Sequence, residues 1–289
     1  MQHQPLVVMT YPGHFLHTAL TIQSYFRHHN TVPVTIIADD LSEHCWPSYI
    51  KDCEDFYNYP VIPMSAIEPT KFFTHGWIRQ QIAKLYLDQV LPYDTWFFTD
   101  GDVEYYFPAP ANSIPYVITR GGQTQILQNN YVSKLLGISD VGIKTEHPDM
   151  NWIPDTTYHQ VCVSYPPFRT MTAKTLQQLR DHVENLHSNT FENMHQSGGI
   201  YRVGHGEDYD HYSVSEWELI ANFQINILHE TIPLVYYPTA YPGTPITPCK
   251  YDFCVSGFDC DTAYPRDWWA NYNITVSDTI WNNLFKIPR

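Results

Sequence analysis

The feature that most constrains the fold is an apolar strand, a helix and a second apolar strand within the first 38 residues. Residues 6–10 form a short apolar run, and residues 15–27 carry apolar side chains at helical spacing on one face. Residues 32–38 are mostly β-branched and apolar and end at Asp39. A strand–helix–strand unit with short loops makes its two strands parallel neighbours. The chain is therefore expected to be an α/β protein with a mostly parallel sheet flanked by helices.

The rest of the pattern extends this unit and then becomes less regular. We expect a third strand at 59–62, a helix at 75–90 and a buried strand at 94–99, and then strands at 116–119, 161–165 and 232–237 and helices at 172–186 and 214–228. No Gly/Ser/Pro-rich linker divides the chain. We predict a single domain over 1–237, with a doubly wound half (1–110) and a second half (111–237). Residues 238–289, rich in Pro, Tyr and Trp, are expected to pack on that domain as a tail.

Composition and charge exclude several classes of partner. The 289 residues are 43% hydrophobic and 16% charged, as in a globular protein, and the formal net charge is −14. An acidic chain of this kind does not suit nucleic acid or an anionic membrane surface, since both attract basic patches. The apolar runs are too short to span a bilayer, and the N-terminus is typical of a first strand rather than a signal peptide. We therefore expect a cytoplasmic protein with reduced cysteines and no transmembrane segment.

Two aspartates directly follow the buried strand at 94–99. Asp100 and Asp102 are separated only by Gly101, so both carboxylates can turn toward one cation at the strand end. Open α/β sheets bind their ligands at this edge. Oxygen ligands suit Mg²⁺ or Mn²⁺, which bridge carboxylates and phosphate oxygens. An isolated Asp-x-Asp is more often a solvated turn, but the apolar strand before it favours the metal site. Gly101 is expected to permit the backbone angles that the turn needs.

The order of three motifs resembles a known group of enzymes. The helix Gly76–Leu85 contains the pattern Trp-x-Arg-Gln-Gln-x-x-Lys, the Asp-Gly-Asp turn follows about fifteen residues later, and Ser215-Glu216-Trp217-Glu218 is a later helix start. Over roughly residues 5–230 this is similar to the Rossmann-like GT-A glycosyltransferases, and more narrowly to a poorly characterised bacterial and viral family within them. Val103 departs from the commonest Asp-x-Asp-Thr form. The resemblance implies Mn²⁺ (or Mg²⁺) and transfer from a nucleotide-sugar donor, expected to be UDP-linked, to a glycan or glycoconjugate acceptor.

Several positions become candidates to hold the donor in the first half. Thr10 and Tyr11, with Asp39, lie where such enzymes bind the nucleoside, and the alternative for Asp39-Asp40 is a cap of the next helix. Arg79, next to Gln80, is expected to pair with the diphosphate or to brace Asp100, and the alternative is an ordinary ion pair. Lys84 lies about 140° around the helix from Arg79, so the two cations need not serve one ligand. The donor-binding set thus also includes Gln80, Lys84, Asp100 and Gly101.

The second half supplies candidates for acceptor chemistry. The resemblance makes Glu216 the expected base that deprotonates the acceptor hydroxyl in an inverting reaction, with Asp208 as substitute. The alternative is that Glu216 only interacts favourably with its helix dipole. The acceptor is expected around Tyr158-His159 and the helix that starts at Glu216.

Two other functions fit part of the sequence. A phosphatase of the haloacid-dehalogenase type also has Asp-x-Asp after an apolar strand, but it requires that motif near the N-terminus and an apolar residue where Glu104 stands. A non-catalytic carbohydrate-binding protein would explain the 22 Tyr, 14 Phe and 8 Trp, but it has no need of the Asp-Gly-Asp turn.

Overall fold

The computed structural model of the chain describes residues 4–73, 76–106, 116–120, 132–138, 161–164, 168–191, 193, 216–230, 234–236, 249–251, 254–256 and 261–287. The chain divides into two compact units. Unit 1 comprises residues 1–112, 167–173 and 244–289, and unit 2 comprises residues 113–166 and 174–243. Residues 244–289 therefore belong with the first half of the chain.

Unit 1 is built on a five-stranded sheet in the order β3-β2-β1-β4-β8. The first four strands are parallel and β8 pairs antiparallel with β4 at the edge. Their bounds are β1 Leu6–Thr10, β2 Val34–Ala38, β3 Val61–Pro63, β4 Thr95–Asp100 and β8 Phe168–Thr172. This confirms the predicted α/β class with a mostly parallel sheet flanked by helices.

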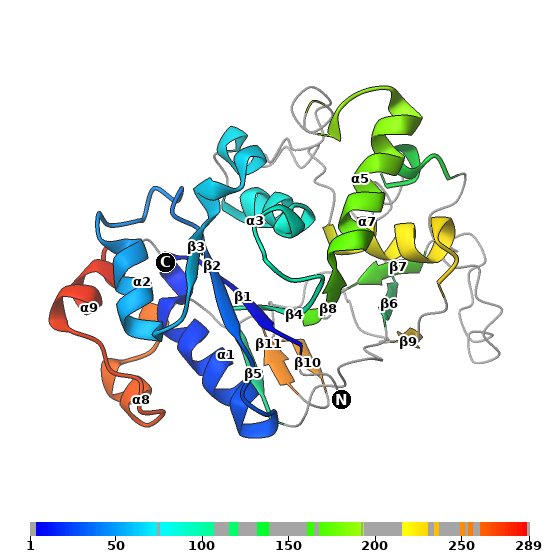
Figure 1. The fold of residues 1–289 in the computed structure, drawn as a ribbon. Helices are drawn as coiled ribbons and strands as arrows, with labels where there is room; N and C mark the ends of the chain where they lie inside the picture. The colour runs from blue at the N-terminus through cyan, green and yellow to red at the C-terminus, as the bar shows by residue number, and fades with distance from the viewer. Residues whose placement is uncertain are drawn as a thin grey trace. The chain divides into compact units, whose positions relative to one another are not determined.

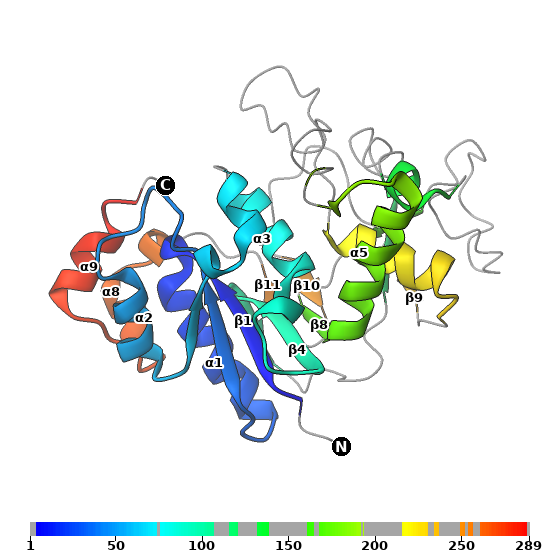
Figure 2. The ribbon, with the colours of Figure 1, turned by 45° about the horizontal axis from the view of Figure 1, so that its top comes forward.

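Helices cover both faces of this sheet (Figures 1 and 2). α1 (Phe15–His28) and α2 (Tyr49–Tyr57) lie on one face and α3 (Gly76–Leu85) on the other. This arrangement follows from right-handed crossovers that run first toward β3 and then back past β1 to β4. Because the central strands are covered on both sides, β1 and β2 are buried at every position, which explains their continuous apolar sequence.

The C-terminal part of the chain completes unit 1. A second sheet has the order β10-β11-β5, in which β5 (Val103–Tyr105) directly follows the Asp-Gly-Asp turn, and β10 (Cys249–Tyr251) and β11 (Cys254–Ser256) come from the tail. α8 (Arg266–Ala270) and α9 (Asp278–Leu284) follow. Trp269 of α8 is 1% exposed, and its ring lies edge-on to that of His17 at 4.6 Å between centroids. The tail is therefore part of the core around α1.

Unit 2 has its own three-stranded sheet in the order β7-β6-β9. The strands are β6 Tyr116–Arg120, β7 Val161–Ser164 and β9 Leu234–Tyr236, and the helices are α5 Ala173–His187 and α7 Glu216–Asn222, followed by a π-helical turn at Phe223–Ile227. The apolar face of α5 is buried through Leu176, Leu179 and Val183. These elements match the expected strands and helices of the second half to within a few residues.

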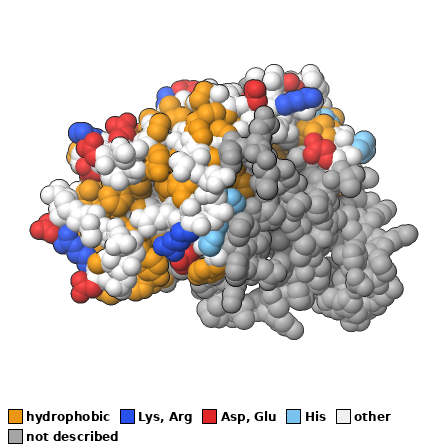
Figure 3. All heavy atoms as spheres, turned by 60° about the horizontal axis from the view of Figure 1, so that its bottom comes forward, with side chains coloured by type: hydrophobic (Ala, Val, Ile, Leu, Met, Phe, Trp, Pro, Cys, Tyr) orange, Lys and Arg blue, Asp and Glu red, His pale blue; other side chains and the backbone are white. Residues whose placement is uncertain are grey.

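The surface of unit 1 carries no concentrated charge on the face that Figure 3 presents. Apolar and uncharged side chains predominate there, and Lys, Arg, Asp and Glu are scattered among them. Among the described residues, no helix is both long and apolar enough to cross a lipid bilayer. Cys45 and Cys53 are both free thiols.

Candidate functional site

Three strands of unit 1 end with polar residues at one edge of the sheet. Thr10 lies beside Ala38 and Met9 beside Asp100 in the parallel registers of β1 with β2 and with β4. The ends of these strands therefore bring Thr10, Asp39 and Asp100 to the same carboxyl edge. The strand order reverses direction between β1 and β4, and open α/β sheets bind their ligands in the crevice at such a point.

The turn after β4 places two carboxylates next to each other. The Asp100 side chain is 19% exposed and Asp102 is also partly exposed. Burial raises the pKa of Asp100 above its usual value, the ammonium of Lys84 lowers it, and the charge of Asp102 raises it further. Two carboxylates that repel each other at a sheet edge provide hard oxygen atoms and a local excess of negative charge, which a divalent cation relieves.

The donor set fits one mode of metal binding. Within the described part of the chain, no cluster of three or more His, Cys, Asp or Glu side chains could hold a metal ion. A cage made only of protein ligands is therefore not seen there. Mg²⁺ and Mn²⁺ in nucleotide-dependent enzymes commonly use one or two carboxylates, waters and substrate phosphate oxygens. Asp100 and Asp102 suit that mode.

Gly101 is required for space. A Cβ atom at this position would lie 2.4 Å from Oγ1 of Thr18 and 2.5 Å from the backbone oxygen of Met9. Its φ angle is not in the left-handed region, since Gly137 is the glycine with positive φ among the described residues. Our attribution of Gly101 to unusual backbone angles was therefore wrong. The glycine lets the turn lie directly against β1 and α1.

Lys84 of α3 forms an ion pair with Asp100. Its Nζ lies 3.0 Å from Oδ1 of Asp100, and its side chain is 3% exposed. The same ammonium lies 5.2 Å from the centroid of the Phe98 ring, within cation–π range. A buried lysine in this position fixes the orientation of the Asp100 carboxylate.

Arg79 of α3 binds Asp39 in a bidentate pair. Nε donates to Oδ1 at 3.1 Å and Nη2 donates to Oδ2 at 3.0 Å, and both side chains are nearly fully buried. Burial raises the pKa of Asp39, and Arg79 lowers it. We expected Arg79 to meet the diphosphate or Asp100; in the structure Lys84 contacts Asp100, and Arg79 orients the carboxylate at the end of β2. The two cations of α3 thus serve two carboxylates.

The alternative assigned to Asp39-Asp40, a cap on the next helix, is wrong. The N-cap position of α2 is Ser48, whose side chain makes no capping bond. Asp40 instead accepts hydrogen bonds from the backbone N–H of Ser65 at 2.8 Å and from its hydroxyl at 2.5 Å. Both aspartates therefore fix the loop that follows β2.

The loop between β1 and α1 carries the other predicted nucleoside contacts. The hydroxyl of Thr18 lies 2.7 Å from that of Thr10, which is 1% exposed. The hydroxyl of Tyr11 lies 2.9 Å from Nε2 of His14, and the two ring centroids are 4.3 Å apart. Thr10 therefore braces the loop from inside, and the partly exposed Tyr11–His14 pair offers ring surface to a ligand.

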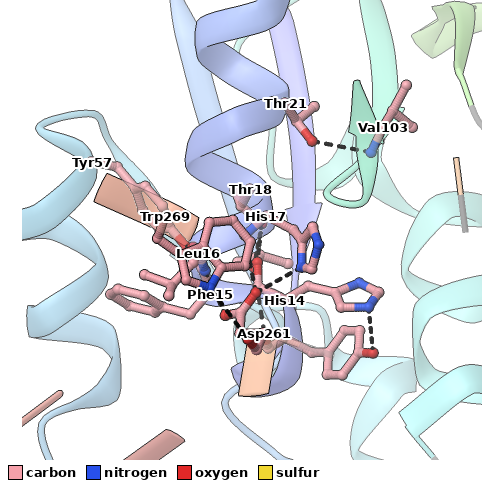
Figure 4. Close-up of polar contacts among 12 residues, drawn as sticks. His14, Phe15, Leu16, His17, Thr18, Thr21, Tyr57, Val103, Asp261 and Trp269 are labelled. Carbon is pink, nitrogen blue, oxygen red and sulfur yellow. Dashed lines mark hydrogen bonds and ion pairs between the residues drawn. The ribbon is translucent and has the colours of Figure 1, made fainter. Parts of the chain in front are cut away.

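This loop is secured by a residue that the sequence did not point to (Figure 4). Asp261 accepts hydrogen bonds from the backbone N–H groups of Leu16 at 2.6 Å and His17 at 3.1 Å, in the first turn of α1. Its Oδ1 also lies 2.7 Å from Nδ1 of His17. The Asp261 carboxylate caps the N-terminus of α1, because His14 at the N-cap position makes no side-chain capping bond. Asp261 is far from α1 in the chain, so no local pattern announces it.

The remaining candidates are placed as follows. Gln80 is half-buried on α3 beside Arg79. Glu216 is the first residue of α7 in unit 2 and is 1% exposed. Asp208 lies outside the described residues, and so do Ser215, Tyr158 and His159.

Comparisons with known proteins do not assign a function to this chain, so the functional assignment depends on the geometry of the site. No protein-family model matches the chain, and no curated protein matches it. Among solved structures, it is similar to an apo structure of the bifunctional glycosyltransferase WbbM, with a TM-score of 0.35 and 11% identity. The match covers 64% of this chain and 34% of that one, so the chain corresponds to about a third of that protein. A similarity this low carries no weight for function.

Proposed function

We propose that this chain is a metal-dependent glycosyltransferase that uses a nucleotide-diphosphate sugar, most consistent with a UDP-sugar. One observation carries the proposal: Asp100 and Asp102 belong to one turn at the carboxyl end of β4, where the strand order reverses, and the charge of Asp102 raises the pKa of Asp100. This combination of position and chemistry suits a cation that bridges protein and pyrophosphate.

The residues of unit 1 divide the work of holding the donor. Asp100 and Asp102 would hold Mn²⁺ or Mg²⁺, and such a cation would supply positive charge to offset that of the departing diphosphate. Lys84 keeps Asp100 oriented through its 3.0 Å contact and adds positive charge beside the phosphates. Asp39, held by Arg79, and the ring of Tyr11 are assigned to the nucleoside. Most of the acceleration then comes from positioning and electrostatic stabilisation.

The acceptor chemistry is assigned to the second half of the chain. Glu216, or Asp208 in its place, is proposed to take the proton from the acceptor hydroxyl as it attacks the anomeric carbon. A carboxylate that acts as base predicts inversion of anomeric configuration. The acceptor is a hydroxyl of a glycan or glycoconjugate.

Thermal unfolding with and without Mn²⁺ tests the donor site. We expect UDP together with Mn²⁺ to raise the melting temperature by about 5 °C at saturation, and UDP with EDTA to leave it nearly unchanged. Asp100→Asn and Asp102→Asn should each remove the Mn²⁺-dependent shift. Asp278→Asn, at a position whose side chain is 86% exposed in α9, is the matched control and should keep it. If no nucleoside diphosphate shifts the melting temperature with either metal, the donor assignment fails.

Product analysis tests the reaction itself. With a stabilising donor identified, NMR of the glycoside product should show an inverted anomeric centre, and Glu216→Gln should lower kcat by a factor of about 100 or more. Retention of configuration would remove Glu216 as base. Phosphate release from simple phosphomonoesters without any sugar donor would favour the phosphatase, and ligand binding that survives loss of both aspartates would favour a carbohydrate-binding protein.

A further inference from the structure

A cavity of about 520 Å³ lies in unit 1 between α1, α2 and the turn after α8. Its size is that of a site for one small organic ligand. None of its lining residues belongs to the candidate donor site, and those on α1 begin at Ala19, beyond the first turn of that helix. The lining residues are Ala19, Ile22, Gln23, Phe26, Arg27, Phe56, Tyr57, Tyr59, Asn273, Ile274 and Thr275.

The apolar part of the cavity is held in a fixed shape. Phe56 stacks on Phe15 with ring centroids 4.9 Å apart and an angle of 26° between the planes. The hydroxyl of Tyr57 donates to the backbone oxygen of Phe15 at 2.6 Å. With Phe26 and Tyr59, the lining contains four aromatic side chains. Rings that are fixed before a ligand arrives lose little entropy on binding.

The rim formed by residues 273–275 is also fixed. Asn273 has φ 57°, in the left-handed region that asparagine tolerates, and its N–H bonds to the oxygen of Ala270 at 3.0 Å. The N–H of Ile274 bonds to the oxygen of Trp269 at 3.1 Å, and Ile274 is 3% exposed. The buried Ile274 thus anchors the turn, and its exposed neighbours Asn273 and Thr275 stand at the cavity mouth.

The polar groups at the mouth are available to a ligand. Within the described residues, the side chains of Gln23, Arg27, Asn273 and Thr275 make no hydrogen bond or ion pair. Two amides, a hydroxyl and a guanidinium therefore face solvent beside aromatic rings. Among the described residues that line the cavity, Arg27 is the one cation and there is no Asp, Glu or Lys. In a chain of net charge −14, this is a local site for a ligand with one anionic group.

We propose that this cavity binds a pyranose sugar that carries one anionic group, either a carboxylate or a phosphate. The C–H face of the ring packs on the aromatic side chains, because those rings combine apolar area with a negative π face. The sugar hydroxyls bond to the amides of Gln23 and Asn273, and the charge pairs with the guanidinium of Arg27. The inference is independent of the proposed donor site, since it involves neither the metal ligands nor the nucleotide.

The experiment measures sugar binding by ligand-observed NMR titration in EDTA, so that the metal site plays no part. The probes are glucuronate, glucose 1-phosphate and uncharged glucose, with acetate and inorganic phosphate as bare anions. We expect at least one anionic sugar to bind about tenfold more tightly than glucose, and the bare anions to compete poorly. Comparison of the two anionic sugars identifies carboxylate or phosphate as the charged group.

Two variants separate the contributions of charge and ring. Arg27→Gln, at an exposed position, should reduce the affinity for the anionic sugar to that for glucose. Phe26→Leu keeps apolar volume but removes a ring face, and it should weaken all three sugars about tenfold. Lys51→Gln, which removes an exposed cation of α2 that does not line the cavity, is the control and should change nothing. The proposal is overturned if the three sugars bind with equal affinity to the wild type and to Arg27→Gln. It is also overturned if none of the sugars binds, or if the bare anions compete as well as the anionic sugars.

Discussion

The carboxylate of Asp261 lies 2.7 Å from Nδ1 of His17, although 244 positions separate the two residues in the chain. Both side chains are 1% exposed. The same carboxylate accepts from two backbone N–H groups of α1, so one side chain of the tail satisfies the first turn of the first helix. The loop that carries Tyr11 and His14 leads directly into that turn.

Asp261→Ala should therefore destabilise the whole of unit 1. The change leaves the N–H groups of Leu16 and His17 without this acceptor, and we expect the free energy of unfolding to fall by about 2 to 3 kcal/mol. Urea denaturation followed by tryptophan fluorescence measures it. The control Asp278→Ala removes an aspartate from the first turn of α9, whose side chain is 86% exposed, and should cost about 0.5 kcal/mol or less. Equal effects of the two changes would contradict the capping role.

A methyl group at position 101 should be poorly tolerated, whereas one at position 76 should not. Gly101→Ala forces Cβ against the Met9 backbone, and we expect a loss of about 2 kcal/mol and a weaker Mn²⁺-dependent nucleotide shift. In Gly76→Ala the new Cβ lies 3.4 Å from Oδ2 of Asp39, an ordinary contact at the start of α3, and helix propensity favours alanine. Thermal unfolding of both variants checks the pair. If Gly101→Ala is as stable as Gly76→Ala, the close approach to β1 is wrong.

The buried pair Arg79–Asp39 should behave as one unit in a double-mutant cycle. Arg79→Met and Asp39→Asn each leave the remaining charge buried and without its partner. We expect each change to lower the free energy of unfolding by about 3 kcal/mol. The double variant should cost at least about 1 kcal/mol less than the sum of the two. The surface pair Lys51–Asp55, 72% and 64% exposed, is the control cycle and should show coupling below about 0.5 kcal/mol. Additive losses at Arg79 and Asp39 would mean that the two do not support each other.

The pKa of Asp100 should respond in opposite directions to its two charged neighbours. Asp102→Asn removes a negative charge and should lower it, and Lys84→Met removes a positive charge and should raise it. Carboxyl ¹³C NMR titration measures both shifts, with Asp55→Asn as a distant exposed control. An unchanged Asp100 pKa in Asp102→Asn would show that the two carboxylates do not share one site.

The raised pKa of Asp100 also has a consequence for stability. Between its ordinary value of 3.8 and the higher value in the folded protein, the folded state holds more protons than the unfolded state. The contribution of Asp100 to the free energy of unfolding therefore falls as pH rises through that window. Asp102→Asn should narrow this pH range and reduce the fall in the free energy of unfolding across it. Denaturation at a series of acidic pH values would detect the difference.

Much of the sheet could be predicted because its strands are buried on both faces. A run such as Val34–Ala38 has no polar side chain apart from Thr35, and the segment that separates it from the first strand is helical in period, so the parallel order follows. The placement of Thr10, Asp39 and Asp100 at one edge follows from that order. α2 was not predicted, because its exposed face is rich in charged residues and only Tyr49, Cys53 and Tyr57 are buried.

The contacts within the site could not be predicted in the same way. The partners of Arg79 and Lys84 depend on how α3 lies over the sheet, and Arg79 and Asp39 are 40 positions apart. The space available at Gly101, in the turn after β4, depends on Thr18, a residue of α1. Strands as short as β10 and β11 carry too few residues for a period to show. Local sequence patterns indicate which side chains are buried, but which side chains contact each other depends on the assembled fold.

Because Asp261 caps α1, the order of synthesis matters for this protein. The ribosome makes α1 well before the acceptor of its first turn, since 244 positions separate His17 from Asp261. Until then the first turn of the helix has to rely on water for the hydrogen bonds that the carboxylate later provides. α1 thus reaches its final state only after Asp261 has been synthesised, so unit 1 cannot complete its folding from residues 1–112 alone.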